Sequence, residues 1–209
     1  MSPELLGRVG VLLGMAWTSG VNLYLTVAAL GLSHRFGWIS LPGDLDVLAH
    51  PVVILIAVAI YLVEFIADKV PYVDSMWDSV HTFIRPVGGA MLGFMALSET
   101  DPVIQMGTAL ICGTIALNSH VAKATTRVAI NASPEPVTNS IASVSEDVVV
   151  LGALWLLIHN PIVIGILVLL FIVLSIWFIP KMIRFLIGSV RYIFGKKKES
   201  ERGNNQAST

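Results

Sequence analysis

Long apolar stretches alternate with short polar segments along most of this chain. Residues rich in Leu, Val and Ile run from 5 to 32, 51 to 67, 86 to 97, 103 to 117, 148 to 158 and 162 to 179. Several of these stretches are shorter than the roughly 20 residues with which a helix crosses a bilayer. We therefore expect neighbouring polar residues to continue the same helices, which gives an all-α protein with about six transmembrane helices.

The overall composition agrees with this pattern. Of the 209 residues, 55% are hydrophobic and 13% are charged, and the mean hydropathy is +0.79. Soluble domains carry about twice that charged fraction. The composition therefore predicts an integral membrane protein with a single transmembrane domain over residues 1–180.

The positions of Lys and Arg predict which side of the membrane each end faces. The chain from Lys181 onward is strongly basic, and cytoplasmic flanks carry such an excess. The carboxyl end is therefore expected in the cytoplasm, and six spans place the amino end there as well. The connections 68–85 and 118–147 hold further Lys and Arg residues and would face the same side.

The carboxyl-terminal part divides into two segments with different physical character. Residues 181–195 place basic side chains near one helical face and apolar ones elsewhere, which predicts an interfacial amphipathic helix that contacts anionic lipids. Residues 196–209 are too polar and small to pack, and we expect a disordered basic and polar tail there.

The two polar segments at 64–86 and 118–147 share the spacing Pro-x-x-Asx-Ser. It is formed by Pro71, Asp74 and Ser75 in the first segment, and by Pro136, Asn139 and Ser140 in the second. The proline is expected to end one helix, and the Asx or Ser side chain to cap the next. Each segment then forms a helical hairpin that turns on the cytoplasmic side. The two hairpins are candidate parallel repeats, with chance similarity between hairpins as the alternative.

One face of the helices in these hairpins carries ionisable or amide side chains, because their spacing follows the helical repeat. The first hairpin contributes a mainly acidic stripe, formed by Glu64, Asp68, Asp74, Asp78, His81 and Arg85. The second contributes His120, Lys123, Arg127 and Asn131 before its turn, and Asn139, Glu146 and Asp147 after it. Desolvated charges need partners, so we expect the acidic stripe to pair with the basic residues of the second hairpin.

The first apolar stretch has a polar interruption of its own near the middle, at residues 18–22. Local unwinding there would expose carbonyl groups that can bind an ion, whereas close packing against another helix would also explain the small residues. We favour close packing. In either case Asn22 needs a hydrogen-bond partner, because a buried amide in lipid is costly without one.

Ionisable groups inside a membrane domain point first to a function. We expect the carboxylates and His81 to line a charged site open to the cytoplasm, in a transporter or channel for a small ion or polar solute, with coupling to protons or a cation. The alternative function is a protein that binds anionic lipid headgroups or a partner protein through His120, Lys123 and Arg127. Helices that protrude into the cytosol with solvated or paired charges would explain the stripes without a function.

Enzymatic and metal chemistry receive less support. The chain has no Gly-x-Ser-x-Gly sequence, and we predict no catalytic residue and no cofactor, with lipid modification as a third functional class. Asp74, Asp78 and His81 are spaced so that they could share a divalent ion on one helical face. Since no Glu-x-x-His or His-Glu-x-x-His pattern is present, an ion-paired face is the preferred interpretation.

Three blocks of sequence resemble a known family. They are TSGVNLYLT, EFIADKVPYVDSMWDSVHTFIRPVGGA, and the run HVAKATTR, NASPEPVTNS and SED. Together they are similar to the bacterial membrane family called domain of unknown function 4126, over most of the predicted transmembrane domain. The resemblance implies a multi-pass protein of the bacterial cytoplasmic (inner) membrane, and it supplies no substrate and no catalytic residue.

Partners are expected from geometry and composition. Six short helices enclose little volume, and a glycine-rich face at Gly88, Gly89 and Gly93 is suited to close approach. We therefore expect a homo-oligomer, with a dimer as the default by symmetry. The remaining expected partner is the lipid bilayer, and no nucleic acid is expected.

Overall fold

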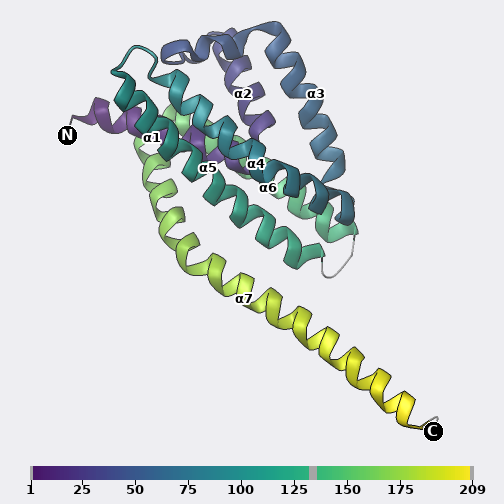
Figure 1. Cartoon of the computed structure of the whole chain (residues 1–209). Helices are drawn as coiled ribbons and strands as arrows, with labels where there is room; N and C mark the ends of the chain where they lie inside the picture. Colours follow the sequence, from purple (N-terminus) through teal and green to yellow (C-terminus); the bar gives the residue numbers. More distant parts are fainter. Residues whose placement is uncertain (1, 132–135, 208–209) are drawn as a thin grey trace.

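The structure is a computed structural model that describes residues 2–131 and 136–207, and it is a bundle of helices (Figure 1). The elements in chain order are α1 (Pro3–Val21), α2 (Leu23–Arg35), the 3₁₀ helix η1 (Gly43–Ala49), α3 (Pro51–Ala67), α4 (Pro71–Ala96), α5 (Pro102–Asn131), α6 (Pro136–His159) and α7 (Pro161–Ala207). No strand occurs in the described ranges, so the all-α class is confirmed.

The helices in the structure give fewer candidate membrane spans, judged by their length and hydropathy, than the six predicted from the sequence pattern. Among the described residues, three helices are long and apolar enough to cross a bilayer: Pro102–Asn131, Val137–His159 and Pro161–Phe185. The pair η1 and α3, bent by 70°, forms a fourth if it counts as one span. These helices suggest a membrane protein, while the count of six spans stays a prediction.

The first apolar stretch is broken at Asn22, where the sequence pattern places an interruption. Asn22 adopts an extended conformation between α1 and α2, and its side-chain oxygen accepts a hydrogen bond from the backbone N–H of Leu25 at 3.0 Å. Close packing is present at the same place. A Cβ atom on Gly20 would overlap the carbonyl of Ala116 and the hydroxyl of Ser119 on α5. The favoured close packing and the alternative, a break in the helix, therefore occur together.

The predicted helix caps after the two prolines are wrong. Helix α4 begins at Pro71, with Val70 as its N-cap and no side-chain cap, and α6 begins at Pro136. Proline is favoured at the first position of a helix, because the N–H that it lacks would have no intrahelical partner there. Asp74 and Asn139 consequently lie inside the first turn with their side chains free to face the bundle. The turn at Pro134 lies outside the described residues.

The helices of each predicted hairpin make few contacts with one another. Instead, α4 packs along α5, and α3 packs mainly against α2 (Figure 1). The expected glycine face of α4 makes the first of these contacts. A Cβ atom on Gly89 would lie 2.5 Å from the Cβ atom of Ala116, so only glycine permits this separation. This packing brings the acidic stripe of α4 against the basic stripe of α5.

The outward faces of the helices are apolar along the part of the chain that carries the charged stripes. Phe83, Val87 and Met91 on α4 are exposed, while Asp78 and Arg85 on the same helix are buried. A soluble helix would expose its charged residues and bury its apolar ones. Helices that protrude into the cytosol would do the same, so this alternative does not fit. The stripes are interior features of an apolar bundle.

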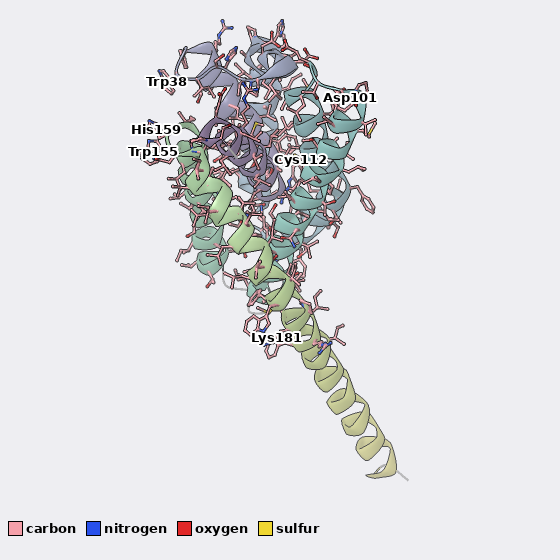
Figure 2. The ribbon with its side chains drawn as sticks, turned by 90° about the vertical axis from the view of Figure 1, so that its left-hand side faces the viewer. Trp38, Asp101, Cys112, Trp155, His159 and Lys181 are labelled. Carbon is pink, nitrogen blue, oxygen red and sulfur yellow. The ribbon has the colours of Figure 1, made fainter. Side chains whose placement is uncertain are left out.

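Buried apolar side chains form a core to which α1, α2, η1, α4, α5, α6 and α7 all contribute. Its members include Met15, Leu30, Leu45, Val150 and Leu154, all buried. Figure 2 shows Trp38 and Asp101 at one end of the bundle and Lys181 toward the other, where α7 leaves it.

Helix α7 is far longer than a membrane span. Its 47 residues continue through Pro180 without a break and extend beyond the other helices (Figure 1). The backbone is helical to Ala207, where an unstructured tail is expected from composition. Residues 196–202 are rich in Lys, Glu and Arg, which favour the helical conformation. The expected interfacial position of residues 181–195 stays a prediction.

Candidate functional site

The candidate residues from both polar segments gather in one buried cluster at the end of the bundle where α4 begins and α5 ends. Twelve of the fourteen are buried: Asn22, Glu64, Asp68, Asp74, Asp78, His81, Arg85, His120, Lys123, Arg127, Asn139 and Asp147. Asn131 and Glu146 are half-buried. We call these fourteen residues the charged cluster.

Arg85 connects four helices at the centre of the charged cluster. Its Nη2 donates to Glu64 Oε1 of α3 at 2.5 Å, and neither side chain has any solvent exposure. Its Nη1 donates to the carbonyl of Gly20 on α1 at 3.2 Å and to Nδ1 of His120 on α5 at 2.9 Å. The carbonyl next to the break in α1 is therefore bound to a guanidinium group.

Lys123 and Arg127 of α5 hold three carboxylates between them. Lys123 Nζ lies 3.5 Å from Glu64, 3.3 Å from Asp68 and 3.4 Å from Glu146. Arg127 binds Glu146 through two bonds of 2.9 Å, from Nε and Nη2, and its Nη2 also lies 3.2 Å from Asp68. The expected pairing of the acidic and basic stripes is confirmed by these contacts.

The hydrogen-bond partners of His81 and His120 determine which ring nitrogen of each carries a proton. Arg85 can only donate, so Nδ1 of His120 accepts, and Nε2 of His120 donates to the carbonyl of Asp78 at 3.1 Å. His120 is therefore neutral. Nδ1 of His81 donates to the carbonyl of Trp77 at 2.8 Å, and Nε2 lies 3.0 Å from the hydroxyl of Tyr24. His81 can take up a second proton at Nε2 if the Tyr24 hydroxyl turns to accept.

Asp74 and Asp147 are held by neutral donors. Asp147 accepts from the amide of Asn22 at 3.0 Å and from the hydroxyl of Tyr61 at 2.8 Å, which supplies the partner that Asn22 was expected to need. Asp74 accepts from the amide of Asn131 at 2.8 Å. Neither carboxylate has a cation within ion-pair distance in the described part of the chain.

The charged cluster carries more carboxylates than permanent cations. Within the described residues it contains six carboxyl groups, Glu64, Asp68, Asp74, Asp78, Glu146 and Asp147, and three permanent cations, Arg85, Lys123 and Arg127. Asp78 is the extreme case: neither of its oxygens takes part in a hydrogen bond, and Oδ1 lies 3.7 Å from Arg85. Uncompensated buried charge is too costly to keep, so the cluster requires further positive charge, as protons or as a cation.

The described residues do not form a site for a divalent metal. No group of three or more His, Cys, Asp or Glu side chains there has the geometry to hold a metal ion. The weak candidates from the sequence do not converge: Asp74 accepts from Asn131, His81 contacts Trp77 and Tyr24, and Asp78 has no hydrogen-bond partner.

Lys69 lies outside the charged cluster. Its ammonium group donates to the carbonyl of Phe65 and lies 3.0 Å from the centre of the Phe65 ring. Burial lowers the pKa of Lys69 from its ordinary value, and Asp68 opposes this shift.

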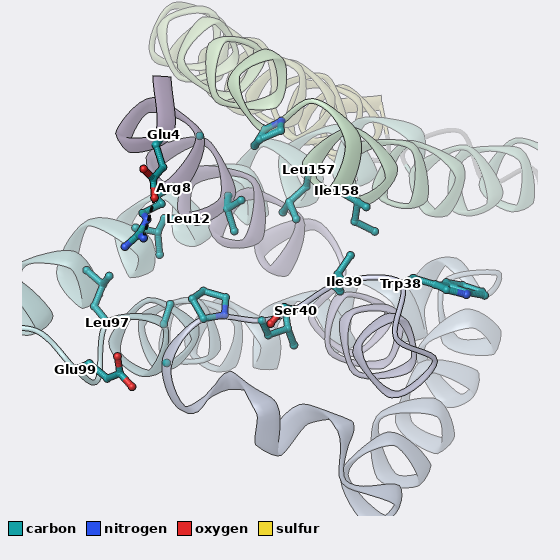
Figure 3. A pocket seen from close by; sticks show the side chains of 17 residues that line it. Glu4, Arg8, Leu12, Trp38, Ile39, Ser40, Leu97, Glu99, Leu157 and Ile158 are labelled. Carbon is teal, nitrogen blue, oxygen red and sulfur yellow. Dashed lines mark hydrogen bonds and ion pairs between the residues drawn. The ribbon is translucent and has the colours of Figure 1, made fainter. Parts of the chain in front are cut away.

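Two of the hollows on the described part of the bundle lie at different levels. A pocket of about 700 Å³ lies at the end remote from the charged cluster, between Trp38, Ser40, Leu97 and the amino end of α1 (Figure 3). The exposed Glu4–Arg8 pair, 3.2 Å apart, lies on its wall. A second hollow of about 470 Å³ reaches Lys123 and Glu146 of the charged cluster from the side.

The model of the domain of unknown function 4126 (DUF4126) matches residues 9–181. The chain belongs to this family. No curated protein matches the chain, and no solved structure matches it. The matched residues include every member of the charged cluster, so the cluster lies within the DUF4126 domain.

Sequence reasoning found the charged residues of this DUF4126 protein but missed several of their neutral partners. Tyr24, Tyr61 and the Gly20 carbonyl hold His81, Asp147 and Arg85 respectively. Tyr61 had a detectable signal, because it lies three residues before Glu64 on α3 and so shares its face. Tyr24 lies two residues after Asn22 and gave no such signal.

Proposed function

We propose that the charged cluster binds exchangeable protons or a small cation, and that the protein is a transporter or channel for a small ion or polar solute. The observation that carries this proposal is the surplus of three carboxylates over permanent cations in a buried position. A purely structural network would be expected to balance its charges, because each uncompensated buried charge destabilises the fold by several kcal/mol.

The groups best placed for exchange are those with weak or neutral partners. Asp78 has no hydrogen-bond donor, Asp74 and Asp147 have neutral donors, and Nε2 of His81 has the Tyr24 hydroxyl as its partner. Proton uptake at Asp74, Asp147 or His81 breaks no Arg or Lys contact, and Asp78 can take up a proton at Oδ2, because Oδ1 is the oxygen that lies 3.7 Å from Arg85. Glu64 and Glu146, which contact permanent cations, would act as the fixed part of the site.

The orientation that goes with this proposal follows from the charge of the connections. The carboxyl end and the charged cluster would face the cytoplasm of a bacterial inner membrane in a homodimer, whereas the amino end of α1, which lines the same pocket as Glu99, would lie on the opposite side. The two polar hairpins would then be parallel repeats. In a Cys112→Ala background, Asp46→Cys and Glu99→Cys should react with an impermeant thiol reagent outside intact cells, and Lys69→Cys should not. Labelling of Lys69→Cys from outside would overturn this orientation.

Binding of an anionic headgroup to the basic stripe is not favoured by the contacts. Lys123 and Arg127 each contact carboxylates, and His120 is neutral and bonded on both nitrogens. An anion would have to displace those carboxylates from a buried position.

The proposal is tested by transport in vesicles. Purified protein in liposomes should move protons together with a cation or small solute, detected with pH-sensitive and ion-sensitive dyes. The double variant Asp74→Asn with Asp78→Asn should lose this flux and keep its fold by size-exclusion chromatography, since amides cannot exchange protons. Glu99→Gln, an exposed acid remote from the cluster, is the matched control and should keep the flux. If no gradient moves under any condition, or the double variant transports normally, the proposal is wrong.

A further inference from the structure

Several buried polar atoms around Arg127 have no hydrogen-bond partner in the described part of the chain. All five N–H groups of Arg127 are already used, on Glu146, on Asp68 and on the carbonyl of Asn139. Oδ1 of Asp68, both ends of the Asn139 amide and the hydroxyl of Ser143 stay unpartnered there, although these side chains are at most 3% exposed. Buried polar groups are rarely left in that state, so an occupant from outside the protein must satisfy them.

Asn139 and Ser143 face Arg127 because of their positions on α6. They are four residues apart, and Glu146 follows three residues after Ser143, so all three share one helical face. Arg127 binds both ends of that face, at the Asn139 carbonyl (3.2 Å) and at Glu146 (2.9 Å). The Ser143 hydroxyl therefore lies on the side of α6 that is turned toward Arg127.

A second group of unpartnered atoms surrounds Arg85. It consists of Oε2 of Glu64, Nε of Arg85 and both carboxylate oxygens of Asp78, on side chains that are at most 5% exposed. Lys123 joins the two groups, because its ammonium group lies 3.5 Å from Glu64 and 3.3 Å from Asp68. A line of unpartnered atoms therefore runs inward from the first turn of α6, past Lys123, to Asp78.

The chemistry of these atoms identifies water as the occupant. Each group mixes donors with acceptors: the Asn139 amide and Nε of Arg85 donate, whereas the carboxylate oxygens only accept. A metal ion satisfies acceptors alone and would be repelled by the N–H groups. In addition, no three His, Cys, Asp or Glu side chains among the described residues could hold one. Water both donates and accepts, and it is the usual partner of buried polar groups that lack one in the protein.

We propose that buried water joins these atoms into a path, that the exchangeable ion of the charged cluster is a proton which reaches Asp78 along this path, and that Asn139 and Ser143 are positioning residues for the water at its outer end. This inference rests on the proposed function, for which it selects the proton over a metal cation. Asp78 takes a proton from the adjacent water, which takes one from the next, and the outermost water takes one from solvent. The uptake neutralises one carboxylate of the surplus.

Asp78 is suited to be the end point of the path because its side chain has no donor in the described residues and its charge is only partly offset. Oδ1 lies 3.7 Å from Arg85, beyond hydrogen-bond distance. His120 donates to the backbone carbonyl of Asp78 and is neutral. The charged groups that interact with the Asp78 carboxylate come from the end of α3, from α4 and from α5: Glu64, Asp68, Asp74, Arg85 and Lys123. Three are carboxylates and two are cations, so a proton on Asp78 removes repulsion that the cations leave in place.

The first test follows protonation itself and needs no transport. After a pH jump in detergent, time-resolved infrared spectroscopy should show the band of protonated Asp78, identified by its loss in Asp78→Asn. Asn139→Leu keeps a branched side chain without hydrogen-bonding groups, and it should slow the appearance of the band about tenfold and keep its final amplitude, because one contact to water is lost. Asn139→Ser, which keeps a polar group and leaves room for water, should be close to the wild-type protein. Equal rates in wild type and Asn139→Leu would overturn the proposal.

Ser143→Ala is the second variant, and Ser145→Ala is its matched control. Both changes remove a hydroxyl from α6, but the Ser145 hydroxyl is exposed and donates to the carbonyl of Ile141. Ser143→Ala should slow the protonation of Asp78 about threefold, and Ser145→Ala should not slow it. If Asn139→Leu fails to fold, this pair decides, and equal rates in the two serine variants contradict the proposal.

The choice of the proton over a metal ion is tested in weakly buffered solution. Sodium chloride or potassium chloride should release no more protons from the purified protein than choline chloride does. A specific release by sodium or potassium would show that a metal ion replaces the proton in the charged cluster, and the proposal would be wrong.

Failure of this inference can be separated from failure of the proposed function. Protonation that slows in Asn139→Leu, without any flux in vesicles, would keep the path and reject transport. Flux that requires sodium or potassium and is unchanged in Asn139→Leu would keep transport and reject the path.

Discussion

The two ends of this helix bundle are both well buried, but they are held together in opposite ways. At the end near Leu30 and Leu45, apolar side chains fill the space between α2, η1 and α4. At the other end, Arg85, Lys123 and Arg127 join α3, α4, α5 and α6 through hydrogen-bonded charges. Apolar packing gives stability without any demand for partners, whereas a buried charge network is stable only while every charge is compensated. The charged end is therefore the part of the bundle whose stability depends on ions.

Removal of Arg85 should give the largest effect and break the charged end alone. Arg85→Met leaves Glu64 buried with no guanidinium partner, so we expect a loss of about 3–5 kcal/mol in unfolding free energy. Reversible unfolding in detergent measures it. The double variant Arg85→Met with Glu64→Gln should recover a large part of the loss, because the stranded charge is gone. Additive effects of the two changes would mean that the pair does not act as a unit.

Truncation in the apolar end should be somewhat smaller and independent of ionic conditions. Leu30→Ala removes a side chain that is 1% exposed and leaves a cavity, which costs about 2–4 kcal/mol. The loss should be the same at low and high salt and at acid and neutral pH. A strong dependence of this loss on salt or pH would show that the apolar end is coupled to the charged end, and it would contradict the independence of the two ends.

Close approach of α4 and α5 should be the next most sensitive feature. Gly89→Ala places a methyl group 2.5 Å from Ala116, so the helices must separate, at a cost of about 1–3 kcal/mol. Gly152→Ala is the matched control, because a Cβ atom there meets no other atom within 4 Å. That change should be neutral or stabilising by up to about 1 kcal/mol, since alanine favours the helix. Equal losses in both variants would contradict the role of this contact.

Loss of a neutral partner should give the smallest effect. Tyr24→Phe removes the hydroxyl beside Nε2 of His81, and a single neutral hydrogen bond contributes about 0.5–1.5 kcal/mol. The fold should survive, while the pH at which His81 titrates, followed by NMR of labelled histidine, should change. An unaltered titration would remove Tyr24 from the charged cluster.

The charged residues and their shared faces could be predicted from the sequence, because helical spacing fixes which side chains lie on one face. Asp74, Asp78, His81 and Arg85 obey this spacing, and all four are buried. The polar interruption at residues 18–22 was visible for a similar local reason, although close packing was preferred there to the break that Asn22 makes. Such features depend on a few neighbouring residues and not on the arrangement of the helices.

The pairing of specific helices could not be predicted in the same way. Glu64 and Arg85 were placed in one acidic stripe, but the ion pair between them joins α3 and α4 and depends on how the helices pack in space. The helix starts at Pro71 and Pro136 were missed because a proline ends one helix and begins another with equal ease. A helix over residues 181–195 was predicted, but its continuity with the preceding apolar helix through Pro180 was missed, because a proline is expected to end a helix.

The surplus of carboxylates in the charged cluster is the central claim, and infrared difference spectroscopy tests it most directly. Protonated carboxyl groups absorb separately from carboxylates, and buried ones shift in heavy water. The wild-type protein should show such a band near neutral pH, diminished in Asp78→Asn and when a bound cation replaces the protons. If no protonated carboxyl group and no bound cation is found at any pH at which the protein is folded, the cluster is balanced by its own residues and the claim is wrong.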